Sequence, residues 1–274
     1  MAHCAHIPAF VLHQVTCQFA TGQTLFGPLS VSLEPSLCGL VGRNGVGKTR
    51  LLRLLEGLDS PAGGHIERAA AVAWVAQQPT LTPETTLATL LGYASVFAAL
   101  SRLEQGQGLA DDFDLLDGHW DLTDRLSLAF READLPPFSA DRPAFSLSGG
   151  ERMKALLCGA FVSGADYLLL DEPTNHLDRQ GREWLYHQLE SWQGGALIAS
   201  HDRELLTRMP RIIELTPTAL RSYGGNYDEY QRQRMAEQQA ARAALEHAVT
   251  DRRRTRARMQ KEHDAAQRRS AQTL

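Results

Sequence analysis

An eight-residue segment, 42–49, has the residue types needed to bind phosphate. It fits the pattern G-x-x-x-x-G-K-[ST] through the run Gly42, Arg43, Asn44, Gly45, Val46, Gly47, Lys48 and Thr49. Glycines let backbone N–H groups point at phosphate oxygens, Lys48 supplies a positive charge, and Thr49 supplies a hydroxyl ligand for Mg²⁺. The apolar run 37–41 before it predicts a buried strand, and 49–55 predicts a helix. A glycine-rich turn before an ordinary helix is the alternative.

Two adjacent carboxylates, Asp171 and Glu172, follow a second apolar run, 167–170, which predicts another buried strand. Side chains alternate along a strand, so these neighbours are expected to take different tasks. Asp171, at the strand end, is placed to hold the Mg²⁺ shell. Glu172 is the candidate to polarise an attacking water, which requires a carboxylate within hydrogen-bond reach. For this short motif, a plain turn is the alternative.

Two further polar side chains follow predicted strands. His201 comes after the apolar run 196–199 and could donate a hydrogen bond to a terminal phosphate. Gln77 comes after the run 72–75 and could reach the Mg²⁺ or the water, and Gln78 is a rival for that role. A turn histidine and a surface glutamine are the ordinary interpretations. For His201, the position after a core strand favours the functional one.

A second element suited to phosphate lies at 148–151, where a stretch with helical composition begins with Ser148, Gly149, Gly150 and Glu151. A helix N-terminus with small residues and a hydroxyl suits a terminal phosphate, although most Ser-Gly starts are ordinary N-caps. The ordered occurrence of all these elements favours the functional interpretation. One domain folded around one nucleotide needs only one phosphate loop. Two of them suggest that each molecule presents half of a composite site.

The order of these elements resembles the ATP-binding-cassette (ABC) family over roughly residues 10–230. The resemblance implies an α/β fold, with a P-loop NTPase core, a mostly parallel sheet, a small antiparallel β part and a helical subdomain. It implies ATP and Mg²⁺ as cofactors, with Phe19 stacked on adenine and Asp178, in the run 174–178, within the nucleotide-binding set. It further implies a head-to-tail dimer, in which ATP lies between one cassette's loop and the other cassette's 148–151 segment.

Three segments resemble the ABC-F subfamily more narrowly. They are Asp-Glu-Pro-Thr-Asn-His-Leu-Asp at 171–178, Ser-His-Asp-Arg at 200–203 and Tyr-Gly-Gly-Asn-Tyr-Asp-Glu-Tyr at 223–230. Proteins of this subfamily lack membrane domains and carry two cassettes, joined by a charged helical linker that inserts beside tRNA on the ribosome. This chain has 274 residues, too few for two cassettes, so we expect the first cassette and the start of the linker. A second cassette, from a homodimer or a separate chain, is the expected partner.

Composition predicts a globular α/β protein without membrane insertion. Strand and helix patterns alternate, which favours a mostly parallel sheet covered by helices. No apolar run approaches the roughly 18 residues that span a bilayer, and the first residues lack the features of a signal peptide. The 4 cysteines are scattered, which suggests reduced thiols and a cytoplasmic location. His3, Cys4 and His6 could bind a metal, although chance ligands near a terminus are the ordinary interpretation.

Charge is distributed unevenly along the chain. Residues 231–274, the basic arm, contain 11 Lys or Arg and 5 Asp or Glu, a net charge of +6, whereas the preceding 230 residues contain 17 and 27, a net charge of −10. Such an arm is typical of nucleic-acid binding through phosphates. Its composition, without Gly or Pro, predicts a helix that frays when alone. A solvated helix is the alternative, and the ABC-F resemblance favours contact with the ribosome, tRNA or rRNA.

The predicted organisation is a nucleotide-binding domain at 8–230 and the basic helical arm at 231–274. The domain is expected to hold a helical subdomain at about 85–165, with helix-forming segments such as 87–103. The leading hypothesis is a cytosolic ABC-F-like ATPase that switches by nucleotide-driven dimerisation and acts on the ribosome. The alternatives are the energy subunit of an ABC transporter, which has no need of the arm, and a truncated ATP-binding fragment with little turnover.

Overall fold

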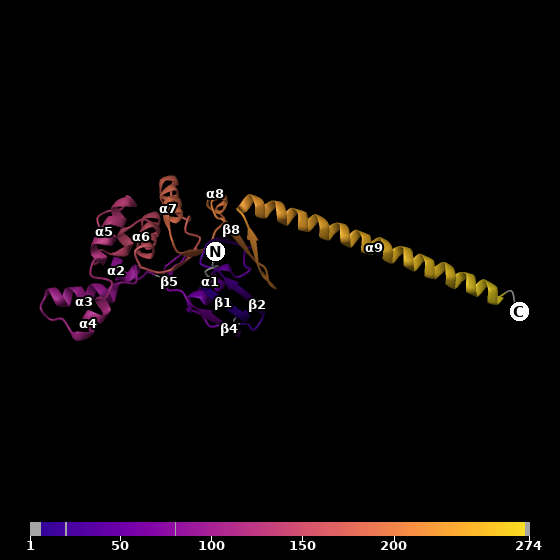
Figure 1. Cartoon of the computed structure of the whole chain (residues 1–274), viewed down its shortest axis with the longest axis horizontal. Helices are drawn as coiled ribbons and strands as arrows, with labels where there is room; N and C mark the ends of the chain where they lie inside the picture. The colour runs from indigo at the N-terminus through magenta and orange to yellow at the C-terminus, as the bar shows by residue number, and fades with distance from the viewer. Residues whose placement is uncertain (1–6, 20, 80, 272–274) are drawn as a thin grey trace, which may run out of the picture. The chain divides into compact units, whose positions relative to one another are not determined.

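The computed structural model describes residues 7–19, 21–79 and 81–271 (Figure 1). The chain divides into two units, the body (Met1–Tyr227) and a C-terminal unit (Asp228–Leu274) that contains the basic arm. Helices and strands alternate along the body. The expectation of a metal at His3, Cys4 and His6 lies outside the described residues.

The larger sheet of the body has six strands in the order β5-β6-β7-β3-β8-β9. Their bounds are β5 Val72–Val75, β6 Tyr167–Asp171, β7 Gly195–Ala199, β3 Leu37–Val41, β8 Arg211–Leu215 and β9 Leu220–Gly224. All neighbours pair in parallel except β8 and β9, so the predicted mostly parallel sheet is confirmed. Every residue of β6 and β7 is buried, as continuous apolar runs require. Parallel pairing brings the carboxyl ends of five strands to one edge.

A smaller antiparallel sheet has the order β2-β1-β4, with β1 at Phe10–Gln18, β2 at Thr24–Leu33 and β4 at Gly63–Arg68. Its inner face and the larger sheet share a core with helix α1 (Lys48–Glu56). The helix contributes four leucines, at positions 51, 52, 54 and 55, all at most 1% exposed. This apolar face anchors α1, and therefore holds the loop that precedes it in place.

A helical region follows β5 in the sequence and gathers at one end of the body (Figure 1). It consists of α2 Leu87–Leu90, α3 Ala94–Glu104, α4 Ala110–Leu116, α5 Leu122–Glu132, the 3₁₀ turn Ala144–Ser146 and α6 Gly149–Phe161. These helices share a second core that includes Phe130, Leu126 and Cys158. The predicted helix-forming segment 87–103 is divided in two at Gly92, whose φ of 82° is left-handed and ends the helical path.

The remaining helices are α7 (Arg179–Ser191) and α8 (Arg203–Thr207) in the body, and α9 (Tyr227–Ala271), which runs through the basic arm. The predicted C-terminal charged helix is therefore confirmed. Among the described residues, none of the helices combines the length and the apolar character needed to cross a membrane. The cysteines that the structure describes, Cys17, Cys38 and Cys158, are buried free thiols.

Candidate nucleotide-binding site

The glycine loop joins β3 to α1 in a conformation that only glycine accommodates. Gly47 is the N-cap of α1 with a φ of 106°, and a Cβ there would lie 2.7 Å from a methyl carbon of Leu25. At Gly42, a Cβ would lie 2.6 Å from the carbonyl oxygen of Leu215. The loop therefore packs against strands of both sheets.

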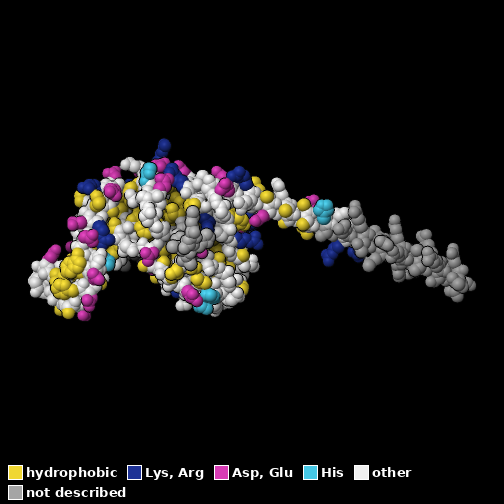
Figure 2. All heavy atoms as spheres, in the orientation of Figure 1, with side chains coloured by type: hydrophobic (Ala, Val, Ile, Leu, Met, Phe, Trp, Pro, Cys, Tyr) yellow, Lys and Arg dark blue, Asp and Glu magenta, His cyan; other side chains and the backbone are white. Residues whose placement is uncertain are grey.

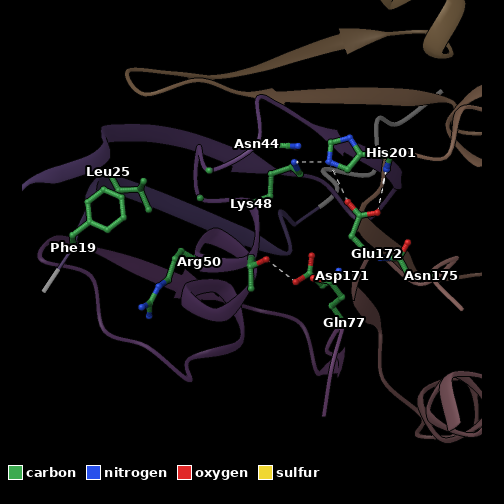
Figure 3. A pocket seen from close by; sticks show the side chains of 13 residues that line it. Phe19, Leu25, Asn44, Lys48, Arg50, Gln77, Asp171, Glu172, Asn175 and His201 are labelled. Atoms are coloured by element: carbon green, nitrogen blue, oxygen red, sulfur yellow. Dashed lines mark hydrogen bonds and ion pairs between the residues drawn. The ribbon is translucent and has the colours of Figure 1, made fainter. Parts of the chain in front are cut away.

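A pocket of about 560 Å³ opens beside this loop (Figure 3). It is lined by the residue that follows β1, by residues of β2, α1 and the glycine loop, and by residues at or after the carboxyl ends of the parallel strands: Phe19, Leu25, Asn44, Gly45, Gly47, Lys48, Thr49, Arg50, Gln77, Asp171, Glu172, Asn175 and His201. Ten of these residues were predicted from the sequence to bind the nucleotide or Mg²⁺ or to act in catalysis. Segments far apart in the sequence thus meet at one edge of the sheet.

Lys48 lies at the centre of the polar half of the pocket. Its Nζ is 3.2 Å from the carbonyl oxygen of Gly42 and 3.1 Å from Nε2 of His201. Burial lowers the pKa of Lys48, and the nearby carboxylates of Glu172 and Asp171 oppose that change. A negatively charged ligand would compensate the partly buried ammonium group in the same way.

Thr49 and Asp171 form a direct pair across the pocket. The hydroxyl of Thr49 donates to Oδ2 of Asp171 at 2.7 Å. Burial raises the pKa of Asp171, while this hydrogen bond and the charge of Lys48 lower it. A hydroxyl and a carboxylate oxygen at this separation are hard donors of the kind that Mg²⁺ prefers, and Gln77 adds an amide oxygen to the same pocket. The residues present therefore fit Mg²⁺.

Glu172 leaves the strand conformation directly after β6. Its φ is 50°, and its N–H donates to the carbonyl oxygen of Ala199 at 2.8 Å. The carboxylate accepts the backbone N–H of His201 at 3.2 Å and lies 3.4 Å from the ring Nε2 of that residue. Burial raises the pKa of Glu172, and the interactions with His201 oppose the rise. Because of this turn, both Asp171 and Glu172 line the pocket instead of diverging as a continued strand would make them.

The opposite half of the pocket is apolar. Figure 3 shows Phe19 and Leu25 together at the end away from Glu172 and His201. Phe19 is 49% exposed although it is a large aromatic residue, and its ring is available to a planar ligand. If the nucleobase of a nucleotide stacked on Phe19 at this end, the phosphates of the same nucleotide would lie at the glycine loop.

Three lining residues were not predicted: Leu25, Arg50 and Asn175. Arg50 directly follows the glycine motif, and its guanidinium is 2.9 Å from Asp59 Oδ2. Asn175 lies within the run 174–178, from which only Asp178 was predicted to bind the nucleotide. Leu25 carries no sequence signal, because it reaches the pocket only through the packing of β2 against the loop.

Several predicted residues lie outside the pocket lining. Within the loop, Gly42 and Arg43 do not line the pocket, and Val46 is buried in the core with its N–H donating to the carbonyl oxygen of Arg43 at 3.1 Å. Asp178 is the N-cap of α7 and accepts the N–H of Gly181 at 2.7 Å.

The 148–151 segment also lies apart from the pocket, at the N-terminus of α6. Ser148 Oγ accepts the N–H of Glu151 at 3.2 Å, and Glu151 Oε2 accepts the N–H of Ser148 at 2.7 Å. These hydrogen bonds form a capping box and lower the pKa of Glu151. A Cβ at Gly150 would lie only 2.7 Å from the carbonyl oxygen of His176. None of residues 148–151 lines the pocket that contains Lys48.

A glycine loop with its lysine, a hydroxyl–carboxylate pair and an aromatic edge define a nucleotide-binding domain of the P-loop class. Comparison with known families agrees, because the family described as "ABC transporter" matches residues 27–175. The chain belongs to the ATP-binding-cassette family.

Two curated relatives of this chain, EttA and YheS, are ABC-F proteins. The chain is 33% identical over 271 residues to the "Energy-dependent translational throttle protein EttA" of Mycobacterium tuberculosis (strain ATCC 25618 / H37Rv), a match covering 90% of this chain and 46% of the relative. It is 34% identical over 217 residues to the "Probable ATP-binding protein YheS" of Escherichia coli (strain K12), covering 74% of this chain and 34% of the relative. The chain thus spans half or less of the length of these relatives.

Solved structures support the same fold. A protein described as "Structure of ATP binding subunit of ABC transporter" superposes with a TM-score of 0.62 at 20% identity, covering 82% of this chain and 92% of that one. The dimeric cassette MJ0796 gives a TM-score of 0.58 at 19% identity, covering 78% and 98%. At these identities the likeness concerns the fold alone.

Proposed function

We propose that the chain binds ATP with Mg²⁺ in the pocket beside the glycine loop and hydrolyses it. The observation that carries this proposal is the meeting of Lys48, the Thr49–Asp171 pair and Glu172 with Phe19 in one pocket. Phe19 would stack on the base, and the loop amides and Lys48 would bind the phosphates. Thr49 and Asp171 would hold the Mg²⁺, with Gln77 beside them, and the ion would neutralise charge that develops on the transferred phosphoryl group.

Glu172 is proposed to orient and deprotonate the attacking water. Its backbone turn and its contacts with His201 hold the carboxylate at the pocket wall. Burial raises the pKa of Glu172, so its carboxylate binds a proton more strongly, which suits a general base. His201 lies within reach of both Lys48 and Glu172, so it is placed to respond to a terminal phosphate inserted between them.

The pocket is proposed to be completed by a second cassette. Asn44, Gly45 and Thr49 remain exposed at its mouth, so one wall is missing from the single body. The Ser148 helix start would supply that wall from a partner molecule, as the backbone N–H groups at a helix N-terminus suit phosphate. The partner is either a second copy or a separate chain, and nucleotide binding then drives dimerisation.

Translation is the proposed process. A relative that matches most of this chain is named a translational throttle protein, and the basic arm carries a net charge of +6. That charge would bind rRNA or tRNA phosphates. We therefore place the protein in the cytoplasm, where ribosomes work.

A transporter energy subunit is the second candidate, favoured by the solved transporter cassettes that share the fold. The ATP pocket does not distinguish the two candidates, whereas the basic arm favours the ribosome. A third possibility is a fragment that binds ATP and turns it over little. The two experiments below distinguish the transporter subunit and the inactive fragment from an ATPase that acts on the ribosome.

The test of hydrolysis uses Glu172→Gln, which keeps the size and the hydrogen-bond acceptor but cannot accept the proton. ATP affinity should be retained, while turnover falls by at least about 100-fold and a dimer accumulates in ATP. Lys48→Ala is the matched control, and it should weaken ATP binding itself. Specific turnover of the unchanged protein should rise with protein concentration. An unaltered rate in the Glu172→Gln protein would refute the assignment.

The test of the partner is co-sedimentation of Glu172→Gln protein from a cell extract, with ATP and without it. Recovery with ribosomes in ATP supports the proposal, and the Lys48→Ala protein should not be recovered there. Recovery with a membrane protein instead would favour the transporter candidate.

A further inference from the structure

Two histidines and a glutamate cluster on the small antiparallel sheet, away from the nucleotide pocket. They are His13 on β1 and His65 and Glu67 on β4. Figure 2 shows histidine side chains beside acidic ones on the part of the body that Figure 1 labels β1 and β4. Their ligand atoms all lie within 4.8 Å of one another, and the structure shows no other such group of three among the side chains that it describes.

The strand register places the three side chains on one face. His13 pairs directly with His65, and Val11 pairs with Glu67, which lies two residues further along the same face of β4. The neighbours of His13 on the other face, such as Leu12, are buried in the core. The cluster therefore faces outward, with its three side chains converging from two hydrogen-bonded strands.

The backbone next to both histidines is irregular. Gln14 has a φ of 52° and Gly64 a φ of 78°, and the pairing of β1 with β4 shifts register after His13. A Cβ at Gly64 would lie 2.2 Å from the carbonyl oxygen of His13, so the two chains approach closely here. This approach stacks the two imidazole rings, with centroids 4.4 Å apart and planes inclined by 15°.

The polar atoms are close but poorly satisfied. Nε2 of His13 lies 3.1 Å from Oε1 of Glu67, and Nε2 of His65 lies 3.8 Å from the same oxygen. The Nε2 atom of His13 is buried, yet it makes no hydrogen bond with any residue in the described part of the chain. When the proton of the His13 ring is on Nδ1, the lone pair of Nε2 faces the lone pairs of the Glu67 oxygen. A cation between them would satisfy both.

From this geometry we propose that His13, His65 and Glu67 bind Zn²⁺, with water at the fourth position. In a tetrahedral site with bonds of about 2.0–2.2 Å, ligand atoms lie roughly 3.3 Å apart. The separation between Nε2 of His13 and Oε1 of Glu67, 3.1 Å, is already near that value. The separation between Nε2 of His65 and Oε1 of Glu67 is longer, 3.8 Å, and rotation of the exposed His65 ring, which lies nearly parallel to that of His13, would bring its Nε2 toward a shared ion. Two imidazoles and one carboxylate select Zn²⁺ over Mg²⁺, which prefers oxygen ligands. The ion would bridge β1 and β4, and strand β1 ends directly before Phe19.

The test is calorimetric titration of the full chain, stripped of metal and free of any polyhistidine tag, with ZnCl₂ and separately with MgCl₂. We expect one Zn²⁺ bound at micromolar concentrations, and no heat from MgCl₂ without nucleotide. His65→Ala and Glu67→Gln each remove one ligand from an exposed position and should weaken Zn²⁺ binding by at least about tenfold. Zn²⁺ should raise the thermal midpoint of the unchanged protein more than that of either variant.

Two controls distinguish this site from other histidines. His187 on α7 is exposed, with Nδ1 3.7 Å from Glu190 Oε2, and His187→Ala should leave Zn²⁺ binding unchanged. The triple change His3→Ala, Cys4→Ser and His6→Ala should also leave it unchanged. The proposal would be overturned if the His65→Ala protein bound Zn²⁺ as tightly as the unchanged protein does. It would also be overturned if the changes at residues 3, 4 and 6 abolished Zn²⁺ binding, or if the unchanged protein did not bind Zn²⁺. None of these outcomes depends on ATP hydrolysis.

Discussion

At the scale of single residues, the pocket holds Lys48, Asp171 and Glu172 in partial burial. Burial lowers the pKa of the lysine and raises the pKa of both carboxyl groups. Each direction shows that the charged form is disfavoured in the folded state. Ligand binding by this site is thus expected to relieve an electrostatic cost that the free protein carries.

This cost predicts how stability depends on pH. Because the pKa of Glu172 is raised in the folded state, the folded protein keeps a proton that the unfolded chain has released. The free energy of unfolding therefore falls as pH rises from the ordinary glutamate pKa through the raised value. Glu172→Gln should be more stable than the unchanged protein above that window, and equally stable below it. Urea unfolding without nucleotide, followed from about pH 4 to about pH 8, measures the difference.

The same direction applies to Asp171, so its change to Asn serves as a second measurement. Glu151 is the matched contrast, because the capping hydrogen bonds lower its pKa. Its contribution to stability is present above the ordinary glutamate pKa and is lost as pH falls through the lowered value. A Glu172→Gln protein less stable than the unchanged one at neutral pH would contradict the argument from burial.

At the scale of elements, the start of α6 shows the structural role of a short motif that we also propose to contact phosphate. The capping box satisfies N–H groups at the helix start, and Gly150 permits the close approach of His176. Small residues at this helix start are therefore required by packing within the chain itself, apart from any contact with phosphate.

Two neighbouring glycines give a matched test of this packing. A Cβ at Gly150 would lie 2.7 Å from the carbonyl oxygen of His176, whereas a Cβ at Gly149 would lie 3.8 Å from the side chain of that residue. Gly150→Ala should lower the free energy of unfolding by about 1–3 kcal/mol because the backbone must shift. Gly149→Ala should change it by less than about 1 kcal/mol. Chemical denaturation measures both, and equal effects would show that packing does not distinguish the two positions.

At the scale of the whole molecule, the chain combines an acidic body with a basic arm. The solvent-exposed Arg252 and Arg256 belong to α9, within the arm, and the exposed Arg131 belongs to α5 of the body. Charges that contact phosphates make binding salt-dependent, because each contact releases counterions from the nucleic acid. Charges that contact no phosphate leave the salt dependence unchanged.

We predict that Arg252→Gln combined with Arg256→Gln reduces the slope of log affinity against log salt concentration by about 1.4–1.8 for ribosomal RNA. Arg131→Gln should leave the slope unchanged, because the body carries no expected RNA contact there. Filter binding between low and moderate salt measures the slope. If the two substitutions in the arm leave the slope unaltered, the result would indicate that the arm is a solvated helix without RNA contacts.

The sequence alone determined the elements with a local cause. Spacing gave the glycine loop, apolar runs gave the buried strands β3, β6 and β7, and the carboxylates and histidine that follow strands were identified as a set. These features follow from neighbours in the chain, so a single sequence contains their signal. The break at Gly92 shows the limit of prediction from local composition. The residues on both sides of Gly92 favour a helix, so composition did not indicate its left-handed conformation.

Only the tertiary structure decided which of these groups meet. The parallel sheet brings Thr49 to Asp171 and Lys48 to His201, while leaving Ser148 outside their pocket. The same is true of His13 and His65, which are separated by 52 positions in the chain but lie opposite each other in the strand register. Contacts between distant segments depend on strand order, register and packing. No short stretch of sequence contains these, and they arise only when the whole body folds.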